Sequence, residues 1–259
     1  MMSVIFFEKV ISQVHHLTDQ VCLHLMGDPL VHPQLNEFIQ ICDQYKVSVF
    51  FVTNGILLRD DKVETLLHPI IQQINFSLHS FNDNFPDKDP TTYLTKIFNY
   101  TELAFQKRPD LYINYRLWNL DSPLGFDQKN LNVKKMIEDY YQIQIDKNVD
   151  VQSHKSIKIK NRLYLHYDTE FIWPSLDLPV IGDKGTCLGL KSHFGILADG
   201  TVVPCCLDKE AGIMLGNLHH QNIDEILQSK KALSIRDGFQ KRILKEELCK
   251  RCNYIERFG

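Results

Sequence analysis

The stretch VSVFFVTNG, residues 47–55, gives the clearest indication of the fold. It consists mostly of β-branched and aromatic residues and ends in Asn54-Gly55, a strong turn signal. The preceding stretch HPQLNEFIQICDQY, residues 32–45, has apolar residues at helical spacing. A helix followed by a buried strand that stops at a turn is the repeating unit of a parallel α/β sheet.

The same alternation continues on both sides of this stretch. The expected helices are residues 3–17, 32–45, 60–67, 91–107 and 130–143, and the expected strands are residues 21–26, 47–55, 72–80, 111–118 and 157–168. We therefore predict an α/β fold whose parallel sheet is either open or curled into a barrel.

The sequence changes character in its last third, where glycines are frequent and five of the seven cysteines lie between residues 187 and 252. This change predicts three segments. A βα part covers residues 1–150, a connecting strand and linker covers residues 151–180, and a small cysteine-rich domain covers residues 181–259.

Composition limits the function classes. The chain has 259 residues, 44% hydrophobic, and a formal net charge of -3, so no polyanion is predicted as a partner and nucleic acid is not expected. The N-terminus lacks a signal-peptide pattern, and no run of about 18 apolar residues occurs, so we expect a cytoplasmic protein without a membrane partner. An odd number of cysteines without an export signal argues against a disulfide framework.

Four of the cysteines have metal-ligand spacing. The Asp199-Gly200 pair predicts a β-hairpin that brings Cys187 toward Cys205. The two-residue gap between Cys249 and Cys252 lets both thiolates face the same ion or cluster. Four thiolates fit either a zinc ion or a 4Fe-4S cluster, and spacing alone does not separate these two.

The other cysteines receive less specific predictions. Cys206 follows Cys205 directly and is expected to be a buried neighbour, with an exchange of roles between the two as the alternative. Cys22 and Cys42 lie in apolar segments, where burial in the core is expected. Several basic residues could offset the charge of a cluster or could form an ordinary solvated helix end, namely Lys241, Arg242, Lys245, Lys250 and Arg251.

Four of the expected strands end in polar or turn residues, at Gly27-Asp28-Pro29, Thr53-Asn54-Gly55, Ser77-Leu78-His79 and 116–119. In parallel βα folds the carboxyl ends of the strands form the ligand site. Strand parity places Asn75, Ser77 and His79 on one face, and likewise Asn114 and Arg116. We therefore predict one polar site shared by these strand ends.

These motifs resemble those of the radical S-adenosylmethionine (radical SAM) superfamily with a C-terminal SPASM or twitch-like domain. Gly27, Asp28 and Pro29 resemble the family's Gly-Gly-Glu-Pro motif, with Asp28 in place of Glu. Asn54 lies in a matching Thr-Asn-Gly, while Ser77 and Arg116 resemble polar groups of the next two strands. The resemblance implies that these residues bind S-adenosylmethionine and that the fold is a partial (β/α) barrel.

The cysteine pattern resembles the opening of the SPASM motif, which implies an auxiliary 4Fe-4S cluster on Cys187, Cys205, Cys249 and Cys252. The family's Cys-x3-Cys-x2-Cys, which holds the radical-generating cluster, does not occur in this sequence. We therefore expect a barrel lacking its first strand, from an incomplete or degenerate family member that is inactive as this chain alone.

The resemblance implies an oxidoreductase family with a peptide or small-molecule substrate and an electron-donor protein as partners. Two other hypotheses remain open from the sequence. One is a non-catalytic electron-transfer or binding module that keeps the 4Fe-4S cluster, and the other is a zinc-stabilised interaction domain.

Overall fold

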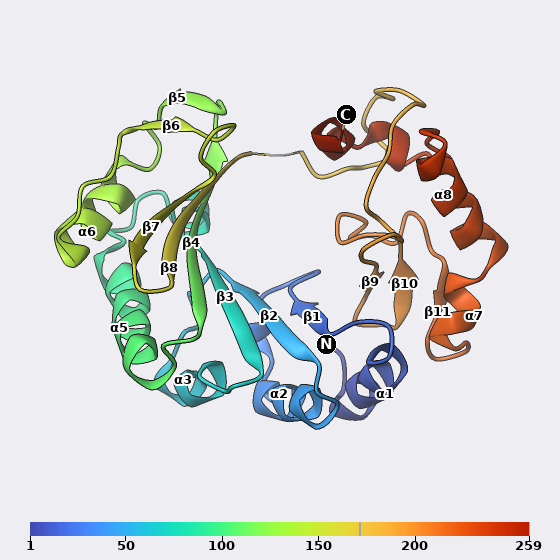
Figure 1. Ribbon diagram of the computed structural model, residues 1–259, viewed down its shortest axis with the longest axis horizontal. Coiled ribbons are helices and arrows are strands. Elements are labelled where there is room, and N and C mark those ends of the chain that lie inside the picture. Colours follow the sequence, from blue (N-terminus) through green and yellow to red (C-terminus); the bar gives the residue numbers. More distant parts are fainter. Residues whose placement is uncertain (171, 259) are drawn as a thin grey trace. The chain divides into compact units, whose positions relative to one another are not determined.

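The structure is a computed structural model that describes residues 1–170 and 172–258. The chain divides into two compact units (Figure 1). The sheet unit is Leu17–Glu170, and the cysteine unit is Met1–His16 together with Phe171–Gly259. Within the described ranges, no helix is both long and apolar enough to cross a membrane.

The sheet unit is built on a six-stranded sheet with the order β1-β2-β3-β4-β8-β7. Its first five strands in that order are parallel, and β7 at the far edge is antiparallel to β8. This confirms the predicted parallel α/β fold. The bounds are β1 Gln20–Leu23, β2 Ser48–Thr53, β3 Ile71–Ser77, β4 Tyr112–Leu120, β8 Leu163–Thr169 and β7 Ser156–Lys160.

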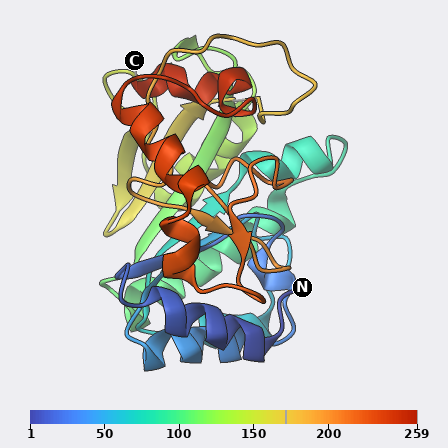
Figure 2. The ribbon, with the colours of Figure 1, turned by 90° about the vertical axis from the view of Figure 1, so that its right-hand side faces the viewer.

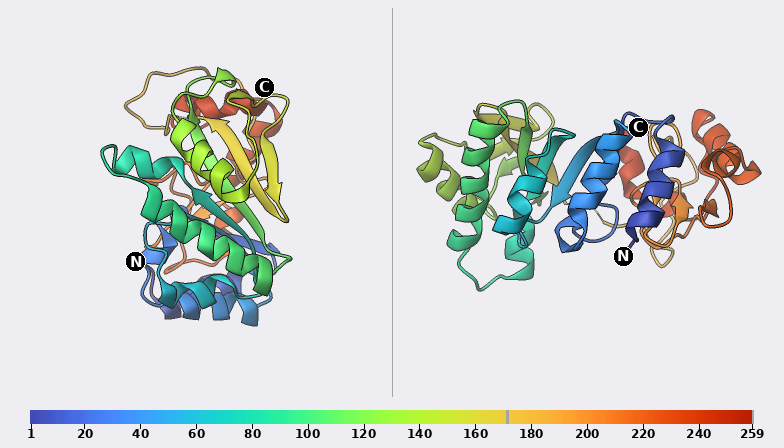
Figure 3. Two further views of the ribbon diagram at one scale, coloured as in Figure 1. Left: turned by 90° about the vertical axis from the view of Figure 1, so that its left-hand side faces the viewer. Right: turned by 90° about the horizontal axis from the view of Figure 1, so that it is seen from below.

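Helices cover one face of this sheet, its outer face (Figures 1 and 3). The helical elements of the unit are η1 Pro29–Val31, α2 Leu35–Gln44, α3 Asp60–Leu66, α4 His79–Asn84, α5 Thr91–Lys107 and α6 Leu131–Tyr141. Alternate strand residues such as Phe51, Phe76 and Ile113 are fully buried toward these helices. Each such side chain contributes roughly 1.5–3 kcal/mol by leaving water. The core therefore lies on the outer face, and the intervening strand residues point to the opposite, inner face.

Three local predictions for the sheet unit were wrong. Residues 157–168 form a hairpin of β7 and β8, because Asn161 adopts a left-handed φ of 47° that a tight turn requires. Residues 146–156, where the lapse of apolar periodicity predicts a linker, contain β6, Asn148–Asp150, which pairs with β5, Leu124–Phe126. The third strand ends at Ser77, so His79 begins α4 instead of continuing the strand.

The cysteine unit contains a three-stranded antiparallel sheet with the order β11-β10-β9. Figure 2 views this unit with α7 and α8 in the foreground. The predicted hairpin is present, with Val202 opposite Ile196 and the φ of Gly200 at +84° in the turn. The elements are α1 Val4–Val14, β9 Gly195–Ile196, β10 Thr201–Val203, β11 Gly216–Asn217, α7 Ile223–Leu227, α8 Lys230–Gln240, η2 Cys249–Arg251 and η3 Asn253–Phe258.

The packing units differ from the predicted segments at two places. Helix α1 packs with the C-terminal residues, and β7 and β8 belong to the sheet although they lie after residue 150. The functional boundaries at residues 150 and 180 stay a prediction.

Candidate cluster site and ligand face

Backbone hydrogen bonds attach the segment before Cys187 to the segment that carries the last two cysteines. The amide of Ile181 donates to the carbonyl of Lys250 at 2.8 Å, and the amide of Gly185 donates to the carbonyl of Arg242 at 3.0 Å. These long-range bonds fix the approach of the chain to Cys187.

Gly189 brings the chain after Cys187 into direct contact with Cys205. A Cβ atom at Gly189 would lie 3.0 Å from the carbonyl oxygen of Pro204 and 3.4 Å from Cβ of Cys205. The amide of Leu190 also donates to Pro204 at 3.1 Å. Since even a methyl group would be crowded here, glycine allows the two cysteine-bearing segments to approach.

Cys249 is electrostatically coupled to the other three predicted ligands. Burial raises its pKa, and the charges of Cys205, Cys187 and Cys252 raise it further, in that order. The amide of Cys252 donates to the Cys249 carbonyl at 3.3 Å within η2, so the two thiols belong to one tight turn. The structure thus brings the four predicted ligands within electrostatic range of one another.

Cys206 belongs to the same group of thiols. It is half-buried, and its pKa is raised by burial and then by the charge of Cys187. Burial raises the pKa of Cys205 to about 12. Thiols in this state are protonated at neutral pH, so binding of a metal cluster would release their protons. Which of Cys205 and Cys206 is a ligand stays a prediction.

The donor chemistry of this group fits an iron-sulfur cluster, because half-buried thiolates are the ligands that such clusters take. Within residues 1–170 and 172–258, no three Cys, His, Asp or Glu side chains lie close enough together to hold a single metal ion.

Most of the basic residues near Cys249 and Cys252 are paired with acids. The ammonium of Lys250 and the guanidinium of Arg251 each lie 2.6 Å from a carboxylate oxygen of Glu247. The ammonium of Lys241 lies 2.7 Å from a carboxylate oxygen of Asp237. The hydrogen bonds from Lys250 and Arg251 lower the pKa of Glu247 to about 2. These ion pairs favour the prediction of an ordinary solvated helix end over the prediction that these residues offset the charge of a cluster. The described residues give no ion pair for Arg242 and Lys245.

In the sheet unit, Asp28 joins two of the predicted strand-end motifs. Its carboxylate accepts hydrogen bonds from the hydroxyl of Thr53 at 2.7 and 2.9 Å, the amide of Asn54 at 2.7 Å and the amide of Leu30 at 2.9 Å. Both carboxylate oxygens are thus engaged within the protein. Asp28 fixes the positions of Gly27-Asp28-Pro29 and Thr53-Asn54-Gly55 relative to each other.

The Thr-Asn-Gly turn is itself tightly constrained. Gly55 has a φ of +74°, and a Cβ atom there would lie 2.8 Å from Cδ1 of Ile97. The side-chain oxygen of Asn54 accepts from the amide of Ile56 at 2.9 Å, and Tyr93 donates its hydroxyl to the Asn54 carbonyl at 2.6 Å. The turn is therefore preformed in this structure.

A ladder of amide side chains lies on the inner face. Asn75, which is fully buried, donates to the carbonyl of Phe51 at 3.1 Å and accepts from Gln73 and Asn114 at 2.9 Å each. Because a carbonyl can only accept, the orientation of all three amides is fixed. In the described part of the chain no group donates to the side-chain oxygens of Gln73 and Asn114, so these oxygens can accept from a ligand. Sequence reasoning missed Gln73, although it shares the strand parity of Asn75.

Arg116 is the main cationic group of this face. Its guanidinium carbon lies 4.2 Å from the ring centroid of Trp118 and 5.6 Å from that of Phe50. In the described part of the chain it has no ion pair or hydrogen-bond acceptor, and burial lowers its pKa to about 10. Ser77 is its register partner on β3, so two predicted ligand residues are adjacent.

Two histidines flank Arg116. The indole of Trp118 donates to Nδ1 of His166 at 3.2 Å, so the neutral ring carries its proton on Nε2. Burial lowers the pKa of His166, and Arg116 lowers it further. Nδ1 of His79 lies 3.0 Å from the Arg116 carbonyl, and burial lowers its pKa as well. Sequence reasoning missed His166, although it opposes Arg116 in the sheet register.

The predictions for the two isolated cysteines had different outcomes. Cys42 is completely buried, as predicted. The prediction that Cys22 is buried was wrong, because its side chain is exposed. The reason is that β1 forms the edge of the sheet, where an apolar sequence does not guarantee cover on both faces.

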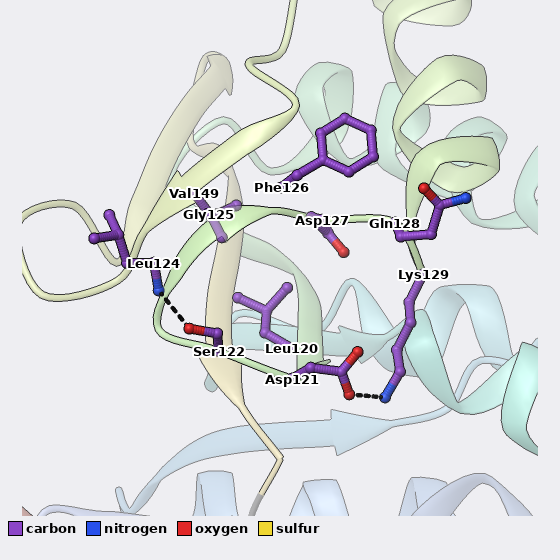
Figure 4. Close-up of a pocket in the computed structure, with 10 residues that line it drawn as sticks. All are labelled: Leu120, Asp121, Ser122, Leu124, Gly125, Phe126, Asp127, Gln128, Lys129 and Val149. Carbon is purple, nitrogen blue, oxygen red and sulfur yellow. Dashed lines mark hydrogen bonds and ion pairs between the residues drawn. The ribbon is translucent and has the colours of Figure 1, made fainter.

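A small hollow of about 50 Å³ lies at the end of β4, where the sequence predicted no site (Figure 4). Lys129 pairs with Asp121 across it at 2.6 Å. Leu124 and Phe126 on its rim are largely exposed. It is lined by Leu120, Asp121, Ser122, Leu124, Gly125, Phe126, Asp127, Gln128, Lys129 and Val149.

Comparison with protein families identifies the cysteine-rich part. Residues 187–253 match the SPASM family, an iron-sulfur cluster-binding domain. This region begins at Cys187 and includes all of the cysteines predicted as ligands. A comparison with curated protein sequences finds no match.

Comparison with solved structures identifies the fold, and the three structures described here are radical SAM enzymes. BtrN in an open conformation is 17% identical, with 97% of this chain and 80% of BtrN covered and a TM-score of 0.56. SuiB from Streptococcus suis is 15% identical, and the match covers 90% of this chain and 61% of SuiB with a TM-score of 0.58. The enzyme anSMEcpe with bound S-adenosylmethionine is 13% identical, and the match covers 98% of this chain and 75% of anSMEcpe with a TM-score of 0.53.

Proposed function

This chain carries a SPASM iron-sulfur cluster-binding domain on the fold of radical SAM enzymes, and from that premise we propose that Cys187, Cys205, Cys249 and Cys252 bind one 4Fe-4S cluster. The observation that carries the proposal is the convergence of three separate segments. Gly189 lies against Cys205, and the segment before Cys187 is hydrogen-bonded to the segment of Cys249. When bound, such a cluster supplies one-electron transfer.

We further propose that the inner face of the sheet binds S-adenosylmethionine through Gly27, Asp28, Pro29, Asn54, Ser77 and Arg116. Arg116 is suited to the methionyl carboxylate, because it is a partly buried cation without an acceptor in the described residues. Asp28 acts as a positioning residue, since its carboxylate already holds the two loops together. Solved structures of BtrN, SuiB and anSMEcpe contain S-adenosylmethionine, which supports the proposal.

The same comparison supports a proposed substrate class. BtrN has been crystallised with 2-DOIA and SuiB with the precursor peptide SuiA. A small molecule or a peptide is therefore the proposed substrate, with oxidoreductase chemistry in the cytoplasm and an electron-donor protein as partner. The amide oxygens of Gln73 and Asn114 and the Nε2 proton of His166 offer further polar contacts on the inner face.

The alternative to this proposal is a module that binds a cluster and transfers electrons without cleaving S-adenosylmethionine. Formation of 5'-deoxyadenosine by the reconstituted protein with dithionite would favour the enzyme, and binding of S-adenosylmethionine without cleavage would favour the module.

Serine variants test the ligand assignment. After anaerobic reconstitution, Cys187→Ser, Cys249→Ser and Cys252→Ser are each expected to lose most of the visible absorption of the wild type. Cys205→Ser and Cys206→Ser form the matched pair, because both thiols are half-buried and adjacent. We expect Cys206→Ser to retain the cluster and Cys205→Ser to lose it, and the reverse result would assign Cys206 as the ligand.

A further inference from the structure

We infer that helix α1 is a structural member of the cluster-binding domain, and that Phe6 is a positioning residue for the hairpin that presents Cys205. Helix α1 lies outside residues 187–253, the part that matches the SPASM family. It nevertheless packs in the same compact unit as those residues. This inference rests on the proposed cluster, and its test separates the two.

The aromatic ring of Phe6 lies against the turn of the β9–β10 hairpin. It stacks on His219 with a centroid separation of 3.9 Å and an interplanar angle of 10°. A Cβ atom at Gly200 would lie 2.7 Å from Cζ of Phe6 and 3.1 Å from Cδ2 of His219. Gly200 therefore meets two requirements, the positive φ of the turn and the close approach of this aromatic pair.

Polar contacts continue the interface along α1. Lys9 donates its ammonium to the carbonyl of Leu218 at 2.7 Å. One turn further, the side-chain oxygen of Gln13 accepts from the amide of Ile223 at 2.9 Å, at the start of α7. An amide at a helix start has no intrahelical partner, so Gln13 supplies the acceptor that α7 lacks.

The two faces of α1 differ in burial. The packed face is almost completely buried, whereas Ile5 on the other face is 83% exposed. The buried residues are Phe6, Phe7, Val10, Ile11 and Val14. Such an apolar stripe at helical spacing is the face that a helix buries in a core, and Phe6 lies on it.

A short path connects this interface to the cluster ligand. Gly200 closes the hairpin, and its carbonyl accepts from the amide of Leu218 at 3.0 Å. Cys205 follows the end of β10 by two residues. Phe6 and Leu218 thus hold the closed end of the hairpin whose other end presents the thiol. Loosening of the turn would therefore loosen the geometry of Cys205.

The test compares Phe6→Ala with Ile5→Ala in the full chain after anaerobic reconstitution. Iron release to an excess of bathophenanthroline disulfonate is expected to be about tenfold faster in Phe6→Ala, since about 1.4 kcal/mol of lost packing and stacking corresponds to that factor. Ile5→Ala, on the exposed face of the same helix, is expected to match the wild type. Phe6→Trp, which keeps an aromatic ring, is expected to restore most of the slow release.

Two measurements keep the inference testable if Phe6→Ala folds poorly. Phe6→Leu keeps apolar volume but removes the ring stack, and it is expected to shift the reduction potential of the cluster and to reduce amide protection in residues 195–203. The inference would be overturned if Phe6→Leu and Phe6→Ala released iron at the wild-type rate and kept the wild-type reduction potential of the cluster. A wild-type protein that takes up no iron would instead contradict the proposed cluster itself.

Discussion

Arg108, at the end of α5, and Arg116, in β4, belong to the sheet unit but have opposite surroundings. The Arg108 guanidinium donates to the carbonyls of four residues and to both oxygens of Asp110, with distances from 2.6 to 3.4 Å. The carbonyls are those of Leu67, His68, Pro69 and Ile71. The Arg116 guanidinium lies over the rings of Trp118 and Phe50, and in the described part of the chain it has no ion pair or hydrogen-bond acceptor.

The contrast separates a structural group from a binding group. A guanidinium with every donor engaged holds a loop in place and has nothing left for a ligand. A partly buried guanidinium without an acceptor loses hydration that an anionic ligand can replace.

The largest expected effect belongs to Arg108→Met. The substitution leaves several carbonyls without their donors, and we expect the free energy of unfolding to fall by about 3 kcal/mol or more. Urea unfolding followed by circular dichroism measures this loss. Arg59→Met, at an exposed ion pair with Asp61, is the control and is expected to change stability by less than about 0.5 kcal/mol.

Arg116→Met is expected to have the complementary effect. The dissociation constant for S-adenosylmethionine should rise about 10- to 100-fold, which corresponds to about 1.4–2.7 kcal/mol for a charge-assisted hydrogen bond. Stability should change less than in Arg108→Met, because only the contacts with the rings of Trp118 and Phe50 are lost and no hydrogen bond or ion pair. Calorimetric titration measures the affinity. An unchanged affinity, or a loss of stability as large as that of Arg108→Met, would remove the distinction between the two arginines.

Gly55→Ala tests whether the Thr-Asn-Gly turn is as rigid as its contacts indicate. An alanine methyl group would have to displace Ile97 and would also strain the positive φ, so we expect a loss of about 2 kcal/mol in the free energy of unfolding. Gly27→Ala is the matched control, because Gly27 also has a positive φ but no atom within 4 Å of the added Cβ. It should cost only the backbone strain, about 1 kcal/mol. Equal losses would show that the contact with Ile97 does not matter.

The smallest expected effect concerns the pH dependence contributed by His166. Its pKa in the folded protein lies below the ordinary value of 6.5, mainly through burial and then through Arg116. Between these two pKa values the unfolded chain binds more protons than the folded protein, so the free energy of unfolding rises with pH. The contribution of His166 to stability is therefore complete above pH 6.5 and is lost as the pH falls through the pKa of the folded protein. In Arg116→Met the pKa of His166 should rise toward 6.5. An NMR titration of the imidazole resonances measures it, and a pKa that does not move would exclude Arg116 as a cause.

Much of the sheet unit could be predicted because its signals are local. The strand that ends at Thr53 and the helix at 91–107 are encoded by periodicity and turn residues within a few positions. Strand parity correctly placed Asn114 and Arg116 on the face opposite Ile113 and Leu117, both of which are fully buried.

The remaining features depend on contacts that are distant in the sequence. The β7–β8 hairpin keeps an unbroken alternation through its turn, so residues 157–168 look like one strand. Exposure of Cys22 depends on the position of β1 at the sheet edge, which a segment of sequence does not reveal. The packing of α1 with residues more than 200 positions away leaves no local signal beyond its apolar stripe.

The central claim is that the cysteine unit binds a 4Fe-4S cluster through Cys187, Cys205, Cys249 and Cys252. The most direct test is the iron and acid-labile sulfide content of the anaerobically reconstituted protein, measured together with its ultraviolet-visible spectrum. We expect about four iron and four sulfide ions per chain and a brown protein that bleaches on reduction. A colourless protein that contains one zinc ion per chain and no sulfide would contradict it.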